Sequence, residues 1–169
     1  TMTVEGGQGM ENMFSYLAHE KPRPGQIEMI QESTEALRSG GYHLAAAPTG
    51  IGKTAAALAA ALEITQNSPN KKHVFFLTSR QSQHRIVVDT VRRINQIRVG
   101  KDPITLVDMI GQSGMCVQPF AKESSLVFSM MCSTARKTKS CRPWITSAPG
   151  LTKRILDSPL HVDELVDLT

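Results

Sequence analysis

Positions 47–54 of the 169-residue sequence read Ala-Pro-Thr-Gly-Ile-Gly-Lys-Thr, a combination suited to binding phosphate. A triphosphate needs several backbone N–H groups turned toward it, and Gly50 and Gly52 adopt the required turn conformations without a Cβ penalty. Lys53 supplies a positive charge for the terminal phosphates, and the hydroxyl of Thr54 can bind Mg²⁺. Ala47 stands where the general phosphate-loop pattern has its first glycine. The candidate nucleotide contacts, with Lys53 and Thr54 as the catalytic pair, are Pro48, Thr49, Gly50, Ile51, Gly52, Lys53 and Thr54.

The sequence on either side supplies the elements that such a loop requires. Residues 42–47 form a short apolar run before the glycines, which predicts a buried strand. Residues 54–65 are rich in alanine and contain no helix breaker, which predicts a helix whose positive N-terminal end faces the same anion. A glycine turn with an incidental Lys-Thr pair is the alternative interpretation. The strand before and the helix after favour the phosphate loop, because a chance match to the pattern would lack them.

Further elements alternate along the chain up to residue 109. Between residues 26 and 37 the positions Ile27, Ile30, Thr34 and Leu37 recur at spacings of three and four, which predicts a helix. Residues 73–78 and 104–109 predict two more strands. Residues 83–97 predict another long helix, whose apolar stripe consists of Ile86, Val87, Thr90, Val91, Ile94 and Ile97. Strands and helices in this order are typical of an α/β domain with a parallel sheet.

The ends of the chain differ from this regular part. Residues 1–9 are glycine-rich and patternless, so we interpret them as a tag remnant before a native start at Met10. Residues 10–111 then form the α/β domain. Residues 112–169 show helix-like pieces near 123–131 and 150–156 with little strand signal. They predict a small, mostly helical module near the C-terminal end.

Charge is distributed unevenly, although the formal net charge is only +4. Between residues 116 and 154 the single acidic residue is Glu123, whereas the basic residues there are Lys122, Arg136, Lys137, Lys139, Arg142, Lys153 and Arg154. Such a cluster fits either a polyanionic partner or an ordinary solvated face. No stretch approaches eighteen uninterrupted apolar residues, so the sequence predicts no membrane partner.

The cysteines are confined to the C-terminal module. Cys116, Cys132 and Cys141 are an odd number of thiols, which argues against a disulfide framework and leaves either a metal site or chance. Fifteen and eight residues separate them, and no Cys-x-x-Cys pair occurs. This spacing is unlike a zinc ribbon, whereas the thiolates of an iron–sulfur cluster can come from distant points in a chain.

Two segments together resemble superfamily 2 helicases. Residues 48–54 look like their motif I, and Arg23-Pro-Gly-Gln26 looks like their adenine-recognition Q motif. The resemblance implies a RecA-like P-loop NTPase fold with ATP and Mg²⁺ as ligands. It also implies nucleotide contacts by Arg23 and Gln26, with Gln26 reading the adenine edge, since an amide both donates and accepts hydrogen bonds.

A third segment, residues 78–83, is similar to motif Ia of the same helicases. In those proteins motif Ia touches the backbone of single-stranded DNA, so the resemblance implies DNA contacts by Arg80, Ser82 and Gln83. Ser79 and Arg80 occupy the places where relatives carry Arg-Thr.

The region from Gly111 resembles one particular group of these helicases. Residues 111–119 (GQSGMCVQP), followed by Cys132 and Cys141, resemble the start of the iron–sulfur domain of XPD-like DNA helicases, the group that includes DinG. The resemblance implies a [4Fe–4S] cluster on Cys116, Cys132 and Cys141, and the family's fourth cysteine is absent from this chain. In that family the module helps to part the duplex and guide one strand. The resemblance therefore implies that the basic residues near the cysteines contact DNA. These residues are Arg136, Lys137, Lys139 and Arg142.

The resemblance implies an N-terminal fragment of an ATP-dependent, 5′ to 3′ DNA helicase of repair or replication. Hydrolysis in such enzymes needs a second carboxylate motif and an arginine from a second motor domain, and the sequence contains neither. Residues 161–165 (HVDEL) do not follow a predicted strand, so we do not interpret them as that motif. The fragment is expected to be a monomer, inactive alone, with single-stranded DNA and duplex junctions as partners. Its expected location is the bacterial cytoplasm or nucleoid, or the eukaryotic nucleus.

Two other functions stay open. One is a different phosphate-loop ATPase, such as a small kinase, with incidental cysteines. The other is a non-catalytic iron–sulfur or nucleic-acid-binding regulator that uses nucleotide only as a ligand.

Overall fold

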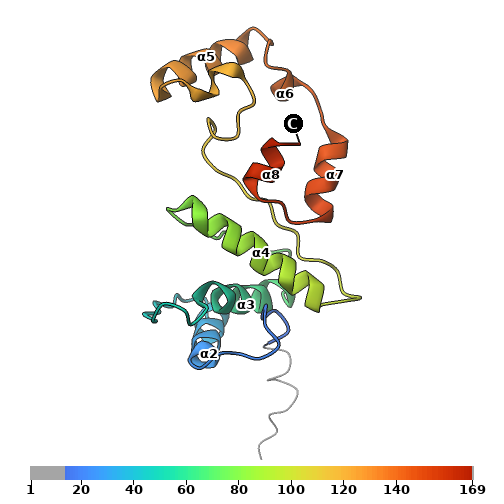
Figure 1. Cartoon of the computed structure of the whole chain (residues 1–169). Coiled ribbons are helices and arrows are strands. Elements are labelled where there is room, and N and C mark those ends of the chain that lie inside the picture. The colour runs from blue at the N-terminus through green and yellow to red at the C-terminus, as the bar shows by residue number, and fades with distance from the viewer. Residues whose placement is uncertain (1–13, 169) are drawn as a thin grey trace, which may run out of the picture. The chain divides into compact units, whose positions relative to one another are not determined.

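The computed structural model describes residues 14–168, which form helices joined by irregular segments (Figure 1). The chain divides into two compact units: unit 1 ends at Ile104 and unit 2 begins at Thr105. The predicted boundary lies later, after Gly111. Residues 1–9, interpreted as a tag remnant, lie outside the described residues. Within residues 14–168 no helix is long and apolar enough to cross a membrane.

The helices of unit 1, as far as it is described, are α2 (Gln26–Arg38), α3 (Lys53–Gln66) and α4 (Gln81–Ile97). They confirm the helices predicted for residues 26–37, 54–65 and 83–97 to within two residues at each end. Helix α3 begins at the lysine of the phosphate-loop pattern.

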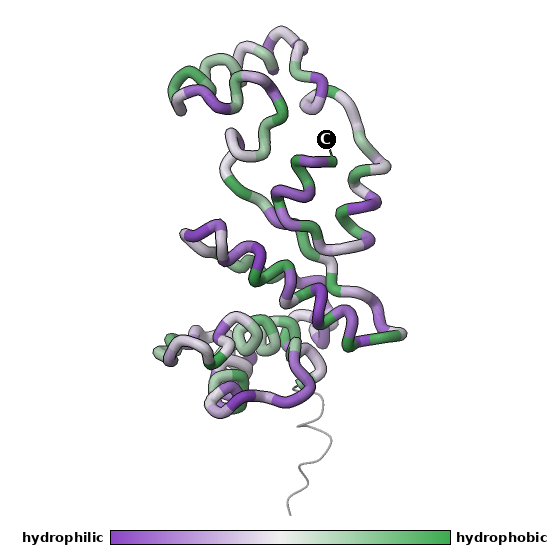
Figure 2. The backbone as a smooth tube through the Cα atoms, viewed as in Figure 1, coloured by the Kyte–Doolittle hydropathy of each residue, from purple (hydrophilic) through white to green (hydrophobic). Residues whose placement is uncertain are grey.

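The core of unit 1 lies where α2 and α4 pack against α3. Figure 2 shows α3 as mostly hydrophobic along its length. Small side chains on this helix let its neighbours approach closely, which is how an alanine-rich sequence contributes to a core. The buried residues of α3 are Ala55, Ala56, Leu58, Ala59, Ala60 and Leu62. From α2, Ile30 and Thr34 are buried as the periodicity predicted, whereas Ile27 and Leu37 are partly exposed.

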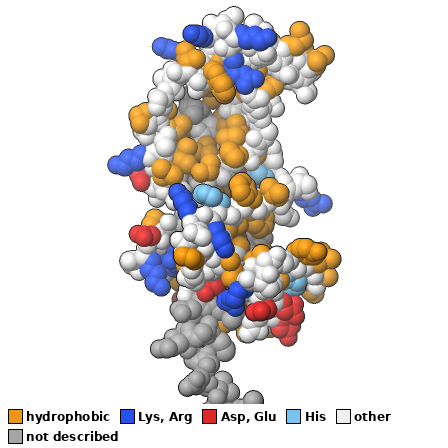
Figure 3. Space-filling view, turned by 180° about the vertical axis from the view of Figure 1, so that it is seen from behind, with side chains coloured by type: hydrophobic (Ala, Val, Ile, Leu, Met, Phe, Trp, Pro, Cys, Tyr) orange, Lys and Arg blue, Asp and Glu red, His pale blue; other side chains and the backbone are white. Residues whose placement is uncertain are grey.

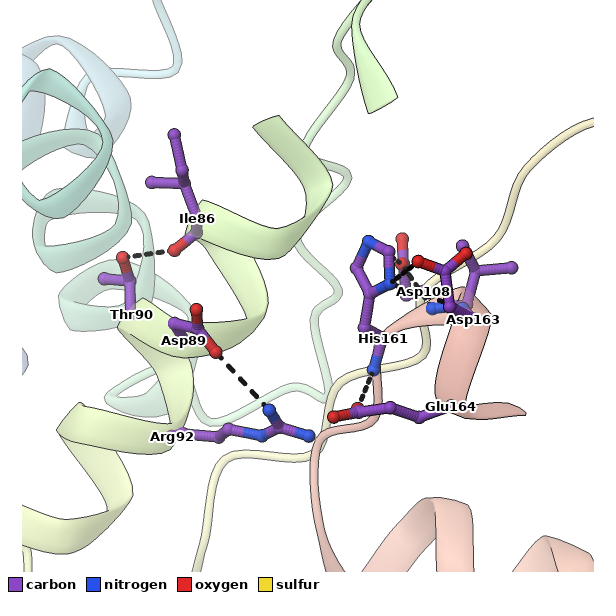
Figure 4. Close-up of polar contacts among 9 residues, drawn as sticks. Ile86, Asp89, Thr90, Arg92, Asp108, His161, Asp163 and Glu164 are labelled. Atoms are coloured by element: carbon purple, nitrogen blue, oxygen red, sulfur yellow. Dashed lines mark hydrogen bonds and ion pairs between the residues drawn. The ribbon is translucent and has the colours of Figure 1, made fainter. Parts of the chain in front are cut away.

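One stripe of α4 enters the core, and it differs from the predicted stripe because Val88 is buried as well, whereas Ile86 and Ile97 are not. The buried residues are Val87, Val88, Val91 and Ile94. Ile86 and Ile97, at the edges of the predicted stripe, are about half exposed at 52% and 48%. Thr90 also belongs to the predicted stripe, but its hydroxyl donates to the carbonyl of Ile86 at 2.6 Å, so its polar group is satisfied within the helix (Figure 4).

The predicted strands at residues 42–47, 73–78 and 104–109 are not formed in the part of the chain that the structure describes. The pairing found there is an isolated parallel bridge between Val107 and Leu160. Tyr42 and Leu44 are 96% and 97% exposed, and Phe75 and Leu77 are 82% and 87% exposed. Figure 3 shows hydrophobic side chains lying at the surface of unit 1.

The missing strands have a physical reason. An apolar run indicates a preference for burial, but a strand forms only when a neighbour satisfies its N–H and C=O groups. The strands of a parallel sheet also need a cover on both faces. The two exposed runs lack such neighbours within the described residues. The parallel α/β sheet therefore stays a prediction.

Unit 2 is built from short helices. They are the 3₁₀ helix η1 (Pro119–Lys122) and the α-helices α5 (Ser125–Lys137), α6 (Arg142–Ile145), α7 (Pro149–Asp157) and α8 (Val162–Val166). The helical pieces predicted near 123–131 and 150–156 are confirmed by α5 and α7, and α5 continues further to Lys137. The core of unit 2 includes Phe128, whose ring centroid lies 6.0 Å from that of Phe120. It also includes Cys132, one turn further along α5.

Helix α8 is fixed by polar contacts that use buried groups (Figure 4). The carboxylate of Asp108 accepts a hydrogen bond from the N–H of Val162 at 2.9 Å. His161 precedes the helix, and its N–H donates to the Glu164 carboxylate at 2.7 Å. In return, Nδ1 of His161 accepts from the N–H of Asp163 at 3.3 Å, which completes a reciprocal cap. These bonds satisfy backbone donors that the start of a helix leaves open.

We expect Ile94→Ala to destabilise unit 1 by about 2–5 kcal/mol, because Ile94 is fully buried and its removal leaves a cavity. Ile97→Ala on the same helix is the matched control, since Ile97 is about half exposed. Urea unfolding followed by circular dichroism measures both free energies of unfolding. Equal losses in the two variants would contradict the assignment of the core to this face of α4.

Candidate nucleotide-binding site

The phosphate-loop glycines have the backbone conformation that their position demands. Gly50 and Gly52 have φ angles of +89° and +88°, in the left-handed region that side chains disfavour. Gly52 is the N-cap of α3, and no side chain caps this helix end. The N–H groups of the first turn of α3 are therefore open to an anion, as a phosphate-binding helix requires.

Gln26 lies directly against the loop. Its Nε2 donates to the carbonyl of Gly52 at 3.2 Å, and its Oε1 accepts from the N–H of Arg23 at 2.8 Å. The residue has no exposed surface. A Cβ added at Gly52 would collide with this amide, so the glycine is needed for space as well as for its φ angle.

Arg23 and Gly25 make two further contacts with the loop. The Arg23 guanidinium donates to the carbonyl of Gly50 at 2.7 Å. A Cβ at Gly25 would collide with the side chain of Ile51, so this glycine also packs closely. Residues 23–26 and residues 50–52 therefore form one assembly, although more than twenty residues separate them in the sequence.

Lys53 lies back over its own loop. Its Nζ donates to the carbonyls of Ala47 and Pro48, each at 2.8 Å, and the side chain is exposed. Two neutral acceptors therefore hold the ammonium group against the backbone of the loop. Thr54 follows in the first turn of α3 and is half-buried. The predicted catalytic pair thus stands at the helix start, next to the open N–H groups.

The structure does not show the Gln26 amide in a position to bind adenine. Both ends of its amide are engaged within the protein, and the residue is buried. The structure gives Gln26 a supporting contact beneath the loop, and its contact with adenine stays a prediction. Arg23, by contrast, is exposed beside the loop.

Burial affects the ionisable groups that precede α2. The pKa of His19 is lowered, chiefly because burial disfavours its charged form and secondarily because the cations Arg23 and Arg93 lie near. The pKa of Tyr16 is raised by burial, and the guanidinium of Arg98, 4.5 Å from the ring centroid, opposes this shift. Arg23 and Lys53 are the cations whose side chains bond to carbonyls of the loop.

The predicted DNA contacts fall in both units. In unit 1, Arg80 is the N-cap of α4, and Ser82 and Gln83 lie in its first turn, all of them exposed. In unit 2, the predicted residues follow the end of α5 and the start of α6: Arg136, Lys137, Lys139 and Arg142. Figure 3 shows Lys and Arg side chains gathered at the end of unit 2 that carries these two helices.

The predicted [4Fe–4S] ligands are not brought together. Cys132 is buried on α5 and accepts from the Gln112 amide at 3.5 Å. Cys141 caps α6 and accepts from the Gln118 amide at 4.0 Å, while Cys116 is half-buried. Among the described residues no group of three His, Cys, Asp or Glu side chains is placed to hold a metal ion. The donor set of Cys116, Cys132 and Cys141 therefore does not fit a cluster in this structure, because each thiol has its own surroundings.

The acidic segment at residues 161–165 forms the start of α8. Glu164 accepts a hydrogen bond from the N–H of His161, and Asp108, which lies outside this segment, accepts one from the N–H of Val162. The sequence reasoning missed the buried contacts of His161 and Asp108. The spacing of His161 and Glu164 is that of a helix capping box, which was the available signal. The parallel bridge at Leu160 shows strand-like pairing just before it, which was not predicted.

A comparison with protein families found that the family described as "Type III restriction enzyme, res subunit" matches residues 19–142. The match covers more than half of the chain. It includes residues 23–26, the phosphate loop, helices α2 to α4 and all three cysteines. Comparisons with curated proteins and with solved structures gave no match.

We expect Gly52→Ala to lower the thermal stability of the chain more than Gly100→Ala does. Both glycines have a positive φ, +88° and +78°, so both variants carry backbone strain. At Gly52 the new methyl group also collides with the Gln26 amide, whereas nothing lies within 4 Å at Gly100. The difference between the thermal unfolding midpoints of the two variants measures the effect of the collision with Gln26. Equal midpoints would show that Gln26 does not pack beneath the loop.

Proposed function

We propose that this chain, which belongs to the family of the type III restriction enzyme res subunit, binds ATP with Mg²⁺ at residues 48–54. The family is one of helicase-like, ATP-dependent enzymes that act on nucleic acids. The observation that carries the proposal is the assembly of residues 23–26 with residues 50–52. An incidental glycine turn would not need two glycines in left-handed conformations supported by a buried amide.

The loop supplies three kinds of attraction for a triphosphate. The uncapped N–H groups of α3 and the positive N-terminal end of the helix attract the anion. Lys53 would exchange the carbonyls of Ala47 and Pro48 for phosphate oxygens, which replaces two neutral acceptors by charged ones. Thr54 would hold Mg²⁺ through its hydroxyl, and the ion would neutralise phosphate charge.

Arg23 would link the loop to the nucleotide. Its bond to the carbonyl of Gly50 fixes the loop from outside, and its charge stands beside the bound anion. Gln26 would keep the loop open by occupying the space below Gly52. In this proposal these residues position the loop, whereas Lys53 and the backbone N–H groups touch the phosphates.

The narrower form of the proposal is an XPD-like, DinG-type DNA helicase that moves 5′ to 3′ and acts in repair or replication. Its support is the likeness of residues 111–119, together with Cys132 and Cys141, to the start of the iron–sulfur domain of those helicases. Single-stranded DNA would then contact Arg80, Ser82 and Gln83 in unit 1 and the basic residues of α5 and α6 in unit 2. The three thiols do not fit a [4Fe–4S] cluster in this structure, so the proposal gives a cluster no part in the reaction.

We expect Lys53→Ala to weaken the binding of ATP·Mg²⁺ by at least about tenfold, because a charged hydrogen-bond donor to phosphate is lost. Isothermal titration calorimetry of the whole chain measures the affinity. Lys101→Ala is the control, since Lys101 is an exposed lysine of unit 1 outside the site. Unchanged affinity in Lys53→Ala would overturn the proposal. Phosphorylation of a small molecule by the wild-type chain would favour a kinase in its place.

We expect anaerobic treatment with iron and sulfide to leave the chain colourless, because Cys116, Cys132 and Cys141 lie in separate surroundings. Visible absorption and iron analysis of the desalted protein measure the result. A brown protein whose colour is lost in Cys132→Ser would show that the thiols do gather. That outcome would support the XPD-like form of the proposal.

A further inference from the structure

A polar pocket in unit 2 has no part in the nucleotide site. Its volume is about 300 Å³, and its wall includes Gln112, Ser113, Ser125, Ser129, Cys132 and Arg136. Four of these residues lie on α5 at successive spacings of four, three and four, so they share one face of that helix. They are Ser125, Ser129, Cys132 and Arg136. Gln112 and Ser113 come from the segment before η1, and the Gln112 amide donates to the sulfur of Cys132.

Arg136 is the only charged residue among those that line this pocket. Its guanidinium lies 5.0 Å from the centroid of the Trp144 ring. Its Nε is buried without a hydrogen-bond partner, and no carboxylate within residues 14–168 pairs with it. A buried donor on a permanently charged group is costly to leave unsatisfied, so the pocket lacks an acceptor that Arg136 needs.

The other polar groups of the pocket are donors as well. The hydroxyls of Ser113, Ser125 and Ser129 make no hydrogen bonds within the described part of the chain. Each hydroxyl can donate to an oxygen ligand. With the guanidinium they form a set of converging donors around a space large enough for one phosphate group.

We propose that this pocket binds a phosphate group through Arg136 and the serine hydroxyls. A guanidinium binds two phosphate oxygens at once, and hydroxyls can satisfy the others. A cation is disfavoured because no Asp or Glu is among the residues that line the pocket, and an apolar ligand because Phe128 is the one large apolar side chain there. The phosphate belongs either to a nucleic-acid strand or to a free anion. The strand form deepens the proposed function and rests on it.

Trp144 makes the proposal measurable. It is the single tryptophan of the chain, and its ring lies against the guanidinium of Arg136. A phosphate that draws Arg136 into hydrogen bonds changes the surroundings of this ring. The first experiment titrates the whole chain with inorganic phosphate, and then with a single-stranded oligonucleotide, while the Trp144 fluorescence is recorded. Potassium chloride at matched ionic strength is the blank.

The variants separate this pocket from the nucleotide site. Lys53→Ala should keep the Trp144 response, because its change lies in the phosphate loop. Ser125→Ala combined with Ser129→Ala keeps Arg136 and Trp144 together but should weaken the response several-fold. Arg136→Gln should weaken binding of a labelled oligonucleotide or of phosphate by about tenfold. Lys122→Gln removes one exposed charge from the same unit and should have little effect.

Each outcome decides the proposal. A saturable response to phosphate that the serine variant weakens supports the pocket. If phosphate also competes with the oligonucleotide, the ligand is a strand phosphate, and if the oligonucleotide has no effect, it is a free anion. The proposal is overturned if Trp144 responds to neither ligand, or if the serine variant and the wild type respond equally. If the wild-type chain does not bind ATP·Mg²⁺ but keeps the Trp144 response, the proposed function alone is refuted.

Discussion

The burial of one amide beneath residues 50–52 organises the candidate nucleotide site of this molecule. Gln26 bonds both to the carbonyl of Gly52 and to the backbone of Arg23, and its burial leaves no space for a side chain at Gly52. The loop, the start of α3 and the start of α2 are therefore fixed together. A phosphate site made of backbone N–H groups depends on such support, because its geometry is set by main-chain angles and not by replaceable side chains.

The two units show different ways of arranging charge. In unit 1, Lys53 and Arg23 both bond to loop carbonyls, so their charges are held next to the open N–H groups of α3. In unit 2, Arg136 has only an aromatic neighbour and a pocket of hydroxyls. Each arrangement leaves some donors without an acceptor: the N–H groups at the uncapped start of α3 in unit 1, and Nε of Arg136 in unit 2. Open donors of this kind are suited to binding an anion. The family of helicase-like, nucleic-acid enzymes to which the chain belongs handles polyanions of this kind.

Local signals were enough to predict much of this structure from the sequence. The periodicity of α2 and α4, the alanine content of α3 and the glycines before Lys53 each depend on a few neighbouring residues, and these elements were placed closely. Signals that depend on distant partners failed. The apolar runs around Leu44 and Phe75 predicted strands, but pairing is a property of the neighbour. Cysteine spacing likewise gave no information on whether the thiols of Cys132 and Cys141 lie close together. The burial of His161 and Asp108 could not be predicted either, because the hydropathy pattern of the sequence does not show it.

The exposed runs around residues 42–47 and 73–78 have a consequence for handling the chain. Within the described residues neither run pairs with a neighbouring strand, and each places bulky apolar side chains at the surface, with no charged residue between Leu44 and Pro48 or between Val74 and Ser79. Such ribbons are templates for one molecule to add to the next, edge to edge. The chain on its own should therefore assemble into β-rich aggregates as its concentration rises, and dilute solutions or a covering polypeptide should keep it dispersed.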